Sequence, residues 1–137
     1  MASKLTHLQF NVRPGNTGFY KDLLEFLGWK TIHADDDTVG AEDANGVSVW
    51  FLAIATDAAN SYDGPGMNHV AFGAETAADV DAAAVFLRAR DVDLLFETPR
   101  HRPEFTGGGD ANTYYQVMFE SPDRILVEVV YQGPKAG

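Results

Sequence analysis

The feature that most constrains this chain is an internal repeat. A strand pattern that contains a histidine, then a helix, then two or three further strands occurs twice. The copies open at Thr6–Phe10 and Asn68–Phe72, which puts His7 and His69 62 residues apart. Repeated units of this kind depend on their neighbours for burial and share a core. We therefore expect a single domain over residues 1–137, made of two modules at about 4–58 and 66–132.

In the first module, Leu5–Val12 alternates apolar and polar residues, as a strand with one buried face does. Asn16 is a good N-cap residue for an amphipathic helix over Thr17–Leu27, and Gly28 fits the position after its last turn. Further strands are expected over residues 29–32, 38–41 and 47–55. Trp50 and Phe51 should then point to opposite faces of the sheet.

The second module follows the same order. Asn68–Gly73 is expected to be a strand, and Thr76 can cap a helix over Ala77–Arg90 with Val80, Ala84 and Leu87 facing inward. Another strand begins over residues 92–97, and a Pro- and Gly-containing segment over residues 99–110 predicts a long loop. The last two strands, over residues 114–120 and 125–131, are joined by a tight turn at residues 121–124.

Composition excludes several classes of function. The chain has 20 acidic and 10 basic residues and a net charge of −10, which argues against nucleic-acid binding because that depends on Lys and Arg. No window is apolar over the roughly 18 residues that a membrane span needs, so no membrane association is expected. The start of the chain lacks the apolar run of a secretory signal, and a cytoplasmic location is expected. Without cysteine, a metal site would use histidine and carboxylate ligands.

The last strand contains one residue that does not fit its surroundings. Ile125–Tyr131 is apolar at every position except Glu128, and a run that is apolar on both faces predicts a buried strand. A buried carboxylate is costly unless a partner compensates its charge. Glu128 therefore points to solvent, pairs with an arginine, or binds a metal ion.

His7 and His69 occupy equivalent places in the two modules, and Glu128 lies in the final strand. Two imidazoles and a carboxylate are a common ligand set for a divalent metal ion that keeps open coordination positions. A lone histidine in a strand is more often an ordinary core or surface residue. The spacing by itself leaves both a metal site and a structural role open.

Three stretches together have a pattern typical of one protein family: the module openings, residues 19–29 (FYKDLLEFLGW) and residues 119–128 (FESPDRILVE). In these the sequence resembles the vicinal oxygen chelate superfamily, which includes glyoxalase I, the bleomycin- and fosfomycin-resistance proteins and the type I extradiol dioxygenases. The resemblance covers about residues 5–131. It implies an α+β fold in which two βαβββ modules form a curled mixed sheet, a cup with flanking helices. It also implies that His7, His69 and Glu128 bind a divalent metal ion (Fe, Mn, Zn or Ni).

The chain departs from individual branches of that superfamily. Glyoxalase I usually has a fourth ligand, a Glu late in the first module, and the matching position is near Phe51; it also tends to have an Arg where this chain has Asn11. Extradiol dioxygenases usually have a Tyr ten residues before the last ligand, and this position is Met118. Arg124 stands in a turn where the family usually has Gly. These departures leave the substrate and the reaction open.

The resemblance implies a metal-dependent enzyme that chelates a small oxygenated substrate: an isomerase or lyase, a ring-cleaving dioxygenase or a resistance transferase. The alternative is a metal-free ligand-binding protein like the bleomycin-resistance proteins. Tyr114 and Tyr115 are the catalytic candidates, and because strand residues alternate in direction only one of them can face the cup. Gln116 and His101 are further candidates, His101 as an exposed loop residue or part of a lid. The resemblance also implies a homodimer.

Overall fold

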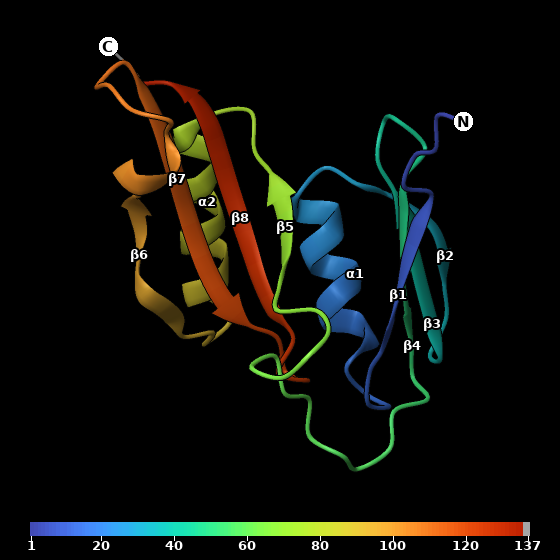
Figure 1. Cartoon of the computed structure of the whole chain (residues 1–137). Coiled ribbons are helices and arrows are strands. Elements are labelled where there is room, and N and C mark those ends of the chain that lie inside the picture. Colours follow the sequence, from blue (N-terminus) through green and yellow to red (C-terminus); the bar gives the residue numbers. More distant parts are fainter. Residues whose placement is uncertain (136–137) are drawn as a thin grey trace. The chain divides into compact units, whose positions relative to one another are not determined.

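The computed structural model describes residues 1–135 and consists of two compact units, Met1–Ala59 and the segment from Asn60 onward. Each unit has the element order strand, helix, strand, strand, strand (Figure 1). Each also contains one four-stranded mixed sheet and one α-helix, which confirms the α+β fold of two βαβββ modules. In the described part of the chain, no helix has the length and apolar character required to cross a membrane.

The first unit has its sheet in the order β1-β4-β3-β2, with β1 parallel to β4 and the other pairs antiparallel. Its elements are β1 (His7–Asn11), α1 (Thr17–Phe26), β2 (Lys30–Ala34), β3 (Thr38–Glu42) and β4 (Ser48–Leu52).

The second unit has the equivalent order β5-β8-β7-β6, with β5 parallel to β8. Its elements are β5 (Val70–Gly73), α2 (Ala77–Arg88), β6 (Leu94–His101), the 3₁₀ helix η1 (Pro103–Phe105), β7 (Asn112–Glu120) and β8 (Leu126–Pro134). The predicted loop over residues 99–110 is wrong in its first part, because β6 continues to His101. Pro99 is tolerated there because β6 is an edge strand.

In the first unit, one face of the sheet packs against α1. The Phe51 ring stacks on Tyr20 of the helix at 4.2 Å between centroids and on Phe10 of β1 at 5.2 Å, and all three are buried. Leu23 and Leu24 complete the helix side of this core. Phe51 therefore faces the helix, and Trp50 faces the opposite side of the sheet.

In the second unit, α2 covers the corresponding face of the sheet. The predicted inward residues Val80, Ala84 and Leu87 are all buried, as is Ala83. On the sheet side, alternate residues of β7 and β8 complete the core: Val117, Phe119, Val127 and Val129. The opposite face of β7 and β8 is thus free to form a site.

The helix starts differ. Thr76 forms a capping box with Asp79, as its position predicts for a helix start. Asn16 occupies the N-cap position of α1, as predicted, but it does so without a side-chain cap. Its φ of −97° and ψ of −6° are near-helical rather than extended, and its side chain makes no capping hydrogen bond.

The turn between β7 and β8 is tightly built. Ser121 Oγ accepts hydrogen bonds from the backbone N–H groups of Asp123 and Ile125, at 3.2 and 3.1 Å. Arg124 has a φ of 56°, in the left-handed region that favours glycine. The turn leads directly into β8, the strand that contains Glu128.

Candidate functional site

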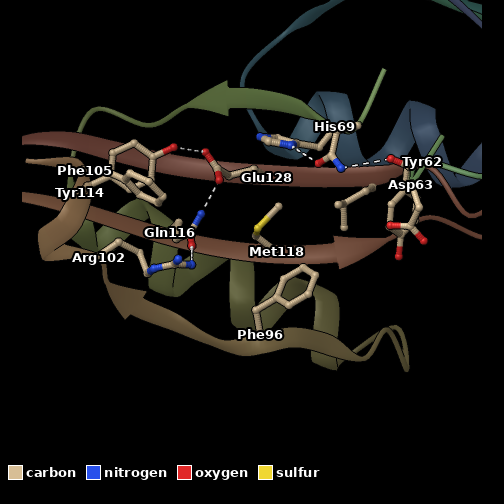
Figure 2. A pocket seen from close by; sticks show the side chains of 12 residues that line it. Tyr62, Asp63, His69, Phe96, Arg102, Phe105, Tyr114, Gln116, Met118 and Glu128 are labelled. Atoms are coloured by element: carbon tan, nitrogen blue, oxygen red, sulfur yellow. Dashed lines mark hydrogen bonds between the residues drawn. The ribbon is translucent and has the colours of Figure 1, made fainter. Parts of the chain in front are cut away.

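A cavity of about 560 Å³ lies in the second unit, on the face of β7 and β8 that points away from α2 (Figure 2). Tyr114, Gln116 and Met118 project from β7 into this cavity, because alternate strand residues share a face. Glu128 and Leu126 project from β8. The other lining residues are Tyr62, Asp63, Asn68, His69, Phe96, Arg102 and Phe105.

Glu128 is buried, with 2% of its surface exposed, and it lies at the centre of this face. Its Oε1 accepts a hydrogen bond of 2.5 Å from the Tyr114 hydroxyl, and its Oε2 accepts one from Gln116 Nε2. The solvent-exposed alternative for Glu128 is therefore wrong. Both of these donors are uncharged side chains, so the pairing of Glu128 with an arginine is not the direct contact seen here.

Gln116 connects Glu128 to a cation. It is 1% exposed, and its Oε1 accepts a hydrogen bond of 2.9 Å from Arg102 Nη1. Arg102 Nε in turn donates to Glu104 Oε1 at 2.5 Å, and the guanidinium lies 5.0 Å from the centre of the Phe105 ring. The result is a chain of hydrogen bonds from Arg102 through Gln116 to Glu128, which fixes the orientation of both buried side chains.

The two candidate tyrosines lie on opposite faces. Burial, the hydrogen bond to Glu128 and the charge of that carboxylate raise the pKa of Tyr114, so its hydroxyl stays protonated and acts as a donor. Tyr115 instead donates to Asp81 Oδ1 on α2 at 2.6 Å, and this bond, with burial, raises its pKa to about 12. Of the two, only Tyr114 lines the cavity.

His69 precedes β5 and lines the same cavity as Glu128. Ala71, two residues after His69, pairs with Glu128 across the β5–β8 ladder, so His69 and Glu128 belong to one face of the sheet. His69 Nδ1 is 2.7 Å from Asn68 Oδ1, and Asn68 Nδ2 donates to the Tyr62 carbonyl at 3.1 Å. An Nδ1–H held in this way would leave Nε2 free to accept a hydrogen bond or to bind a metal ion.

His7 has the equivalent place in the first unit. It is exposed at the start of β1, with Nδ1 3.1 Å from Thr6 Oγ1. Over residues 1–135, no three His, Asp or Glu side chains are grouped to hold a metal ion. The second unit thus brings two of the predicted ligands, His69 and Glu128, to one cavity, and the part of His7 stays a prediction.

The strand registers show which residue of the first unit corresponds to Glu128 of the second unit. Gln9, two residues after His7, pairs with Trp50, just as Ala71, two residues after His69, pairs with Glu128. Trp50 therefore occupies the position that corresponds to Glu128. The sequence had placed the equivalent of Glu128 near Phe51. The residue is Trp50, one position earlier, because Phe51 faces α1.

His101 is not a loop residue. It ends β6 and pairs with Tyr115, so it lies on the face away from the cavity, with Nδ1 2.6 Å from Thr113 Oγ1. Sequence reasoning instead missed Arg102 and Phe96, which line the cavity. The two prolines near them favoured a loop, and no local signal distinguished a bulged edge strand.

One rim of the cavity is formed by Tyr62, which sequence reasoning also missed. Its hydroxyl donates to Glu120 Oε1, and this bond raises the pKa of Tyr62. Arg124 lies with its Nε 3.6 Å from Glu120 Oε2 and its guanidinium 5.7 Å from the centre of the Tyr62 ring. These contacts hold the segment before β5 against the β7–β8 turn.

Comparison with solved structures shows the fold in other proteins. A candidate glyoxalase from Bacillus halodurans superposes with a TM-score of 0.73 and 26% identity, over 93% of this chain and 94% of that chain. A glyoxylase/bleomycin resistance protein/dioxygenase domain from Frankia sp. EAN1pec gives 0.68 and 20%, over 97% and 94%. The fosfomycin resistance protein FosX from Listeria monocytogenes, in complex with Mn(II) and a sulfate ion, gives 0.67 and 20%, over 97% and 93%.

Sequence comparison is less informative. No model of a known protein family matches the chain. The uncharacterized protein YqjT of Bacillus subtilis (strain 168) is 42% identical over 65 residues, which are 47% of this chain. The match spans 46% of the length of that protein, slightly less than half.

Proposed function

Since this chain has the fold of the vicinal oxygen chelate superfamily, we propose that it is a metal-dependent enzyme of the glyoxalase/dioxygenase type. In this proposal, His69 and Glu128 of the second unit and His7 of the first unit bind a divalent metal ion, and a small oxygenated molecule is the substrate. The observation that carries it is the environment of Glu128.

Glu128 is a buried carboxylate whose described hydrogen-bond donors, Tyr114 and Gln116, are both neutral. Burying a charge is costly unless a counter-charge compensates it, and the nearest link to a cation passes through Gln116 to Arg102. Each carboxylate oxygen retains a second lone pair after accepting one hydrogen bond. A divalent ion on the cavity side would therefore complete the environment of Glu128 without displacing Tyr114 or Gln116.

The donor set suits Fe, Mn, Zn or Ni, which all accept imidazole and carboxylate ligands. When bound, such an ion would act as a Lewis acid toward one or two substrate oxygens and stabilise negative charge as it develops there. Mn(II) is the ion found with FosX, which has the same fold. This makes manganese one of the ions to test first.

The residues around Glu128 would hold its carboxylate in one orientation before a metal ion binds. Gln116 and Tyr114 hold its two oxygens from one side, so that Glu128 enters the site already oriented. Tyr114 keeps its proton because its pKa is raised, and it can serve as a hydrogen-bond donor but not as a base at neutral pH. The reaction class is an isomerisation or lyase reaction, a ring cleavage or a resistance-type transfer.

One observation favours a second function, that of a metal-free binding protein. Both oxygens of Glu128 already accept hydrogen bonds within the protein, so the buried carboxylate has partners without a metal ion. A protein of this kind would hold its ligand in the same cavity without transforming it.

Metal analysis distinguishes the two functions. Protein purified without a histidine tag should contain close to one equivalent of a transition metal per chain, measured by inductively coupled plasma mass spectrometry after dialysis against each candidate ion. His69→Ala and Glu128→Ala should each reduce this content by about tenfold or more, because each removes one of three ligands. His33→Ala is the matched control, since His33 is exposed and bonds to Asp35 on the first unit. Metal content that is low in the wild type and unchanged in the variants would contradict the enzyme and favour the binding protein.

We also propose a homodimer, and mixing variants tests it together with the origin of His7. Light scattering should give about twice the 14.9 kDa mass of one chain. If His7 serves the site of the partner, mixing His7→Ala with His69→Ala protein and allowing exchange should restore one intact site in each mixed dimer. If each chain supplies its own three ligands, the mixture should stay as low in metal as its components.

A further inference from the structure

The edge strand of the second unit contains a bulge beside the cavity. Leu95 pairs with Met118 and Arg100 pairs with Gln116, so residues 96–99 of β6 stand opposite a single residue of β7. Within this bulge Phe96 and Glu97 have φ values of 56° and 60°. Left-handed backbone is rare for a non-glycine residue, above all for a bulky one, and persists only where the surrounding structure enforces it.

Thr98 holds the bulge in place. Its hydroxyl donates to the Leu95 carbonyl at 2.7 Å and accepts a hydrogen bond of 2.9 Å from the Met118 N–H. Thr98 is buried, so these bonds are shielded from water. The bulge is therefore a fixed part of the sheet, of the kind that redirects a side chain next to a functional site.

The side chain redirected here is that of Phe96. It is 53% exposed and lines the cavity opposite Met118, as Figure 2 shows. Leu126 adds a further apolar side chain to this region. The lining changes along β7: Tyr114 and Gln116 donate hydrogen bonds to Glu128, whereas Met118 presents an apolar thioether to the cavity. The cavity thus has a polar end at Glu128 and an apolar part at Phe96, Met118 and Leu126 (called the apolar end below), and Tyr62 and Asp63 lie beyond Met118 (Figure 2).

The charges of the residues that line the cavity do not favour a negatively charged ligand. Among the described residues that line the cavity, Arg102 is the one permanent cation, and it already bonds to Glu104 and Gln116. The acids on the lining are Asp63 and Glu128. A metal ion at Glu128 would add positive charge at the polar end only, and Arg124 beside Tyr62 already pairs with Glu120, so no cation of the described lining would compensate a negative group near Phe96.

We infer that the cavity takes a small amphipathic molecule, whose oxygen-bearing end lies at Glu128 and whose uncharged apolar body packs on Phe96 and Met118. Phe96 is then the residue that selects the apolar body, through ring and thioether contacts. The volume of about 560 Å³ is within the range of cavities that enclose small organic ligands. The orientation of the polar end rests on the proposed function, whereas the apolar end does not.

A fluorescent probe tests the apolar end directly. N-Phenyl-1-naphthylamine is neutral and brightens in apolar surroundings, and titration should show saturable binding to the wild-type protein. Phe96→Gly should weaken this binding by about tenfold, the size expected for losing an aromatic contact together with its buried area. Glycine suits a φ of 56°, so this variant keeps the bulge, which a circular dichroism melt of the variant checks.

The control is Phe26→Ala, which removes a phenyl ring that is 41% exposed on α1 of the first unit and should bind the probe as the wild type does. A second comparison uses 1-anilinonaphthalene-8-sulfonate, the same ring system with a sulfonate group, which should bind at least about tenfold more weakly because its charge is not compensated. Absence of probe binding, equal binding by Phe96→Gly, or preference for the sulfonate would overturn the inference.

Metal content measured on the same samples separates this inference from the proposed function. Phe96→Gly should retain the metal content of the wild type. Glu128→Gln should lose metal and still bind the neutral probe, because the apolar end is intact. Loss of metal binding in all samples with retained probe selectivity would refute the enzyme and leave the amphipathic ligand standing.

Discussion

The two units have the same order of strands and α-helix, but they differ on the face of the sheet that points away from the helix. In the first unit, the Trp50 ring lies directly over Gly40 of β3, so close that a Cβ on Gly40 would lie 2.6 Å from it. In the second unit, the corresponding pair is Glu128 and Met118, and a cavity lies above them. The two units therefore place equivalent residues at equivalent points of the sheet. The size and charge of the side chain at each point decide whether that part of the sheet is covered by a ring or lines a cavity.

Strand length adds a second difference. β3 and β4 have five residues each, whereas β7 and β8 have nine. The extra length of β7 places Gln116 and Tyr114 beyond the row of Glu128, where both reach its carboxylate diagonally. In the first unit, β3 and β4 continue in this direction only to the pair Thr38 and Leu52, so no paired position there corresponds to Tyr114. The polar end of the cavity is therefore a product of strand extension as well as of residue identity.

The largest effect is expected from removing the buried amide of the second unit. Gln116→Leu keeps the volume but leaves Glu128 Oε2 and Arg102 Nη1 without their partner, and this should lower the free energy of unfolding by about 2–3 kcal/mol. Urea denaturation monitored by circular dichroism measures the change.

Gln132→Leu provides the control for this measurement. Gln132 is exposed on the same face of β8, so the same chemical change should alter stability by less than about 0.5 kcal/mol. Equal effects in the two variants would show that the buried hydrogen-bond chain is not what stabilises this face.

A smaller effect is expected from disturbing the covered face of the first unit. Gly40→Ala should destabilise the protein by about 1–2 kcal/mol, because the added methyl group meets the rigid Trp50 ring. In a Trp50→Ala background the same replacement should be close to neutral. A double-mutant cycle measures the coupling, and additive effects would contradict the role of Trp50 as the cover.

The smallest effect concerns the helix side of the second unit at alkaline pH. The Tyr115 hydroxyl donates to Asp81, and its pKa is raised from 10.0 to about 12. A raised pKa means that the folded state holds the proton more tightly, so this contribution is complete below pH 10 and is lost as the pH rises through 12.

Stability measured across this window should fall less steeply in Tyr115→Phe than in the wild type. Absorbance at 295 nm should show one fewer late-ionising tyrosine in the variant. An unchanged alkaline titration would show that the Asp81 contact does not hold the Tyr115 proton.

Much of the architecture was readable from the sequence because it rests on short-range patterns. The alternation in β1, the apolar spacing of α2 and the Thr76 cap each reflect contacts within a few residues. The repeat of His7 and His69 then indicated that the two halves have one plan. The loop predicted over residues 99–110 was wrong in its first part, because pairing with β7 extends β6 through Pro99 to His101.

The sequence by itself determined the fold class, the equivalence of the two modules and the unusual character of Glu128, because hydrophobic periodicity and a misplaced charge are visible in one dimension. Only the tertiary structure decided what surrounds that charge. The register of β7 against β8 brings Tyr114 and Gln116 to Glu128, and the bulge in β6 places Phe96 on the lining of the same cavity. Pairing registers and bulges depend on contacts between strands distant in sequence, so no local pattern specifies them.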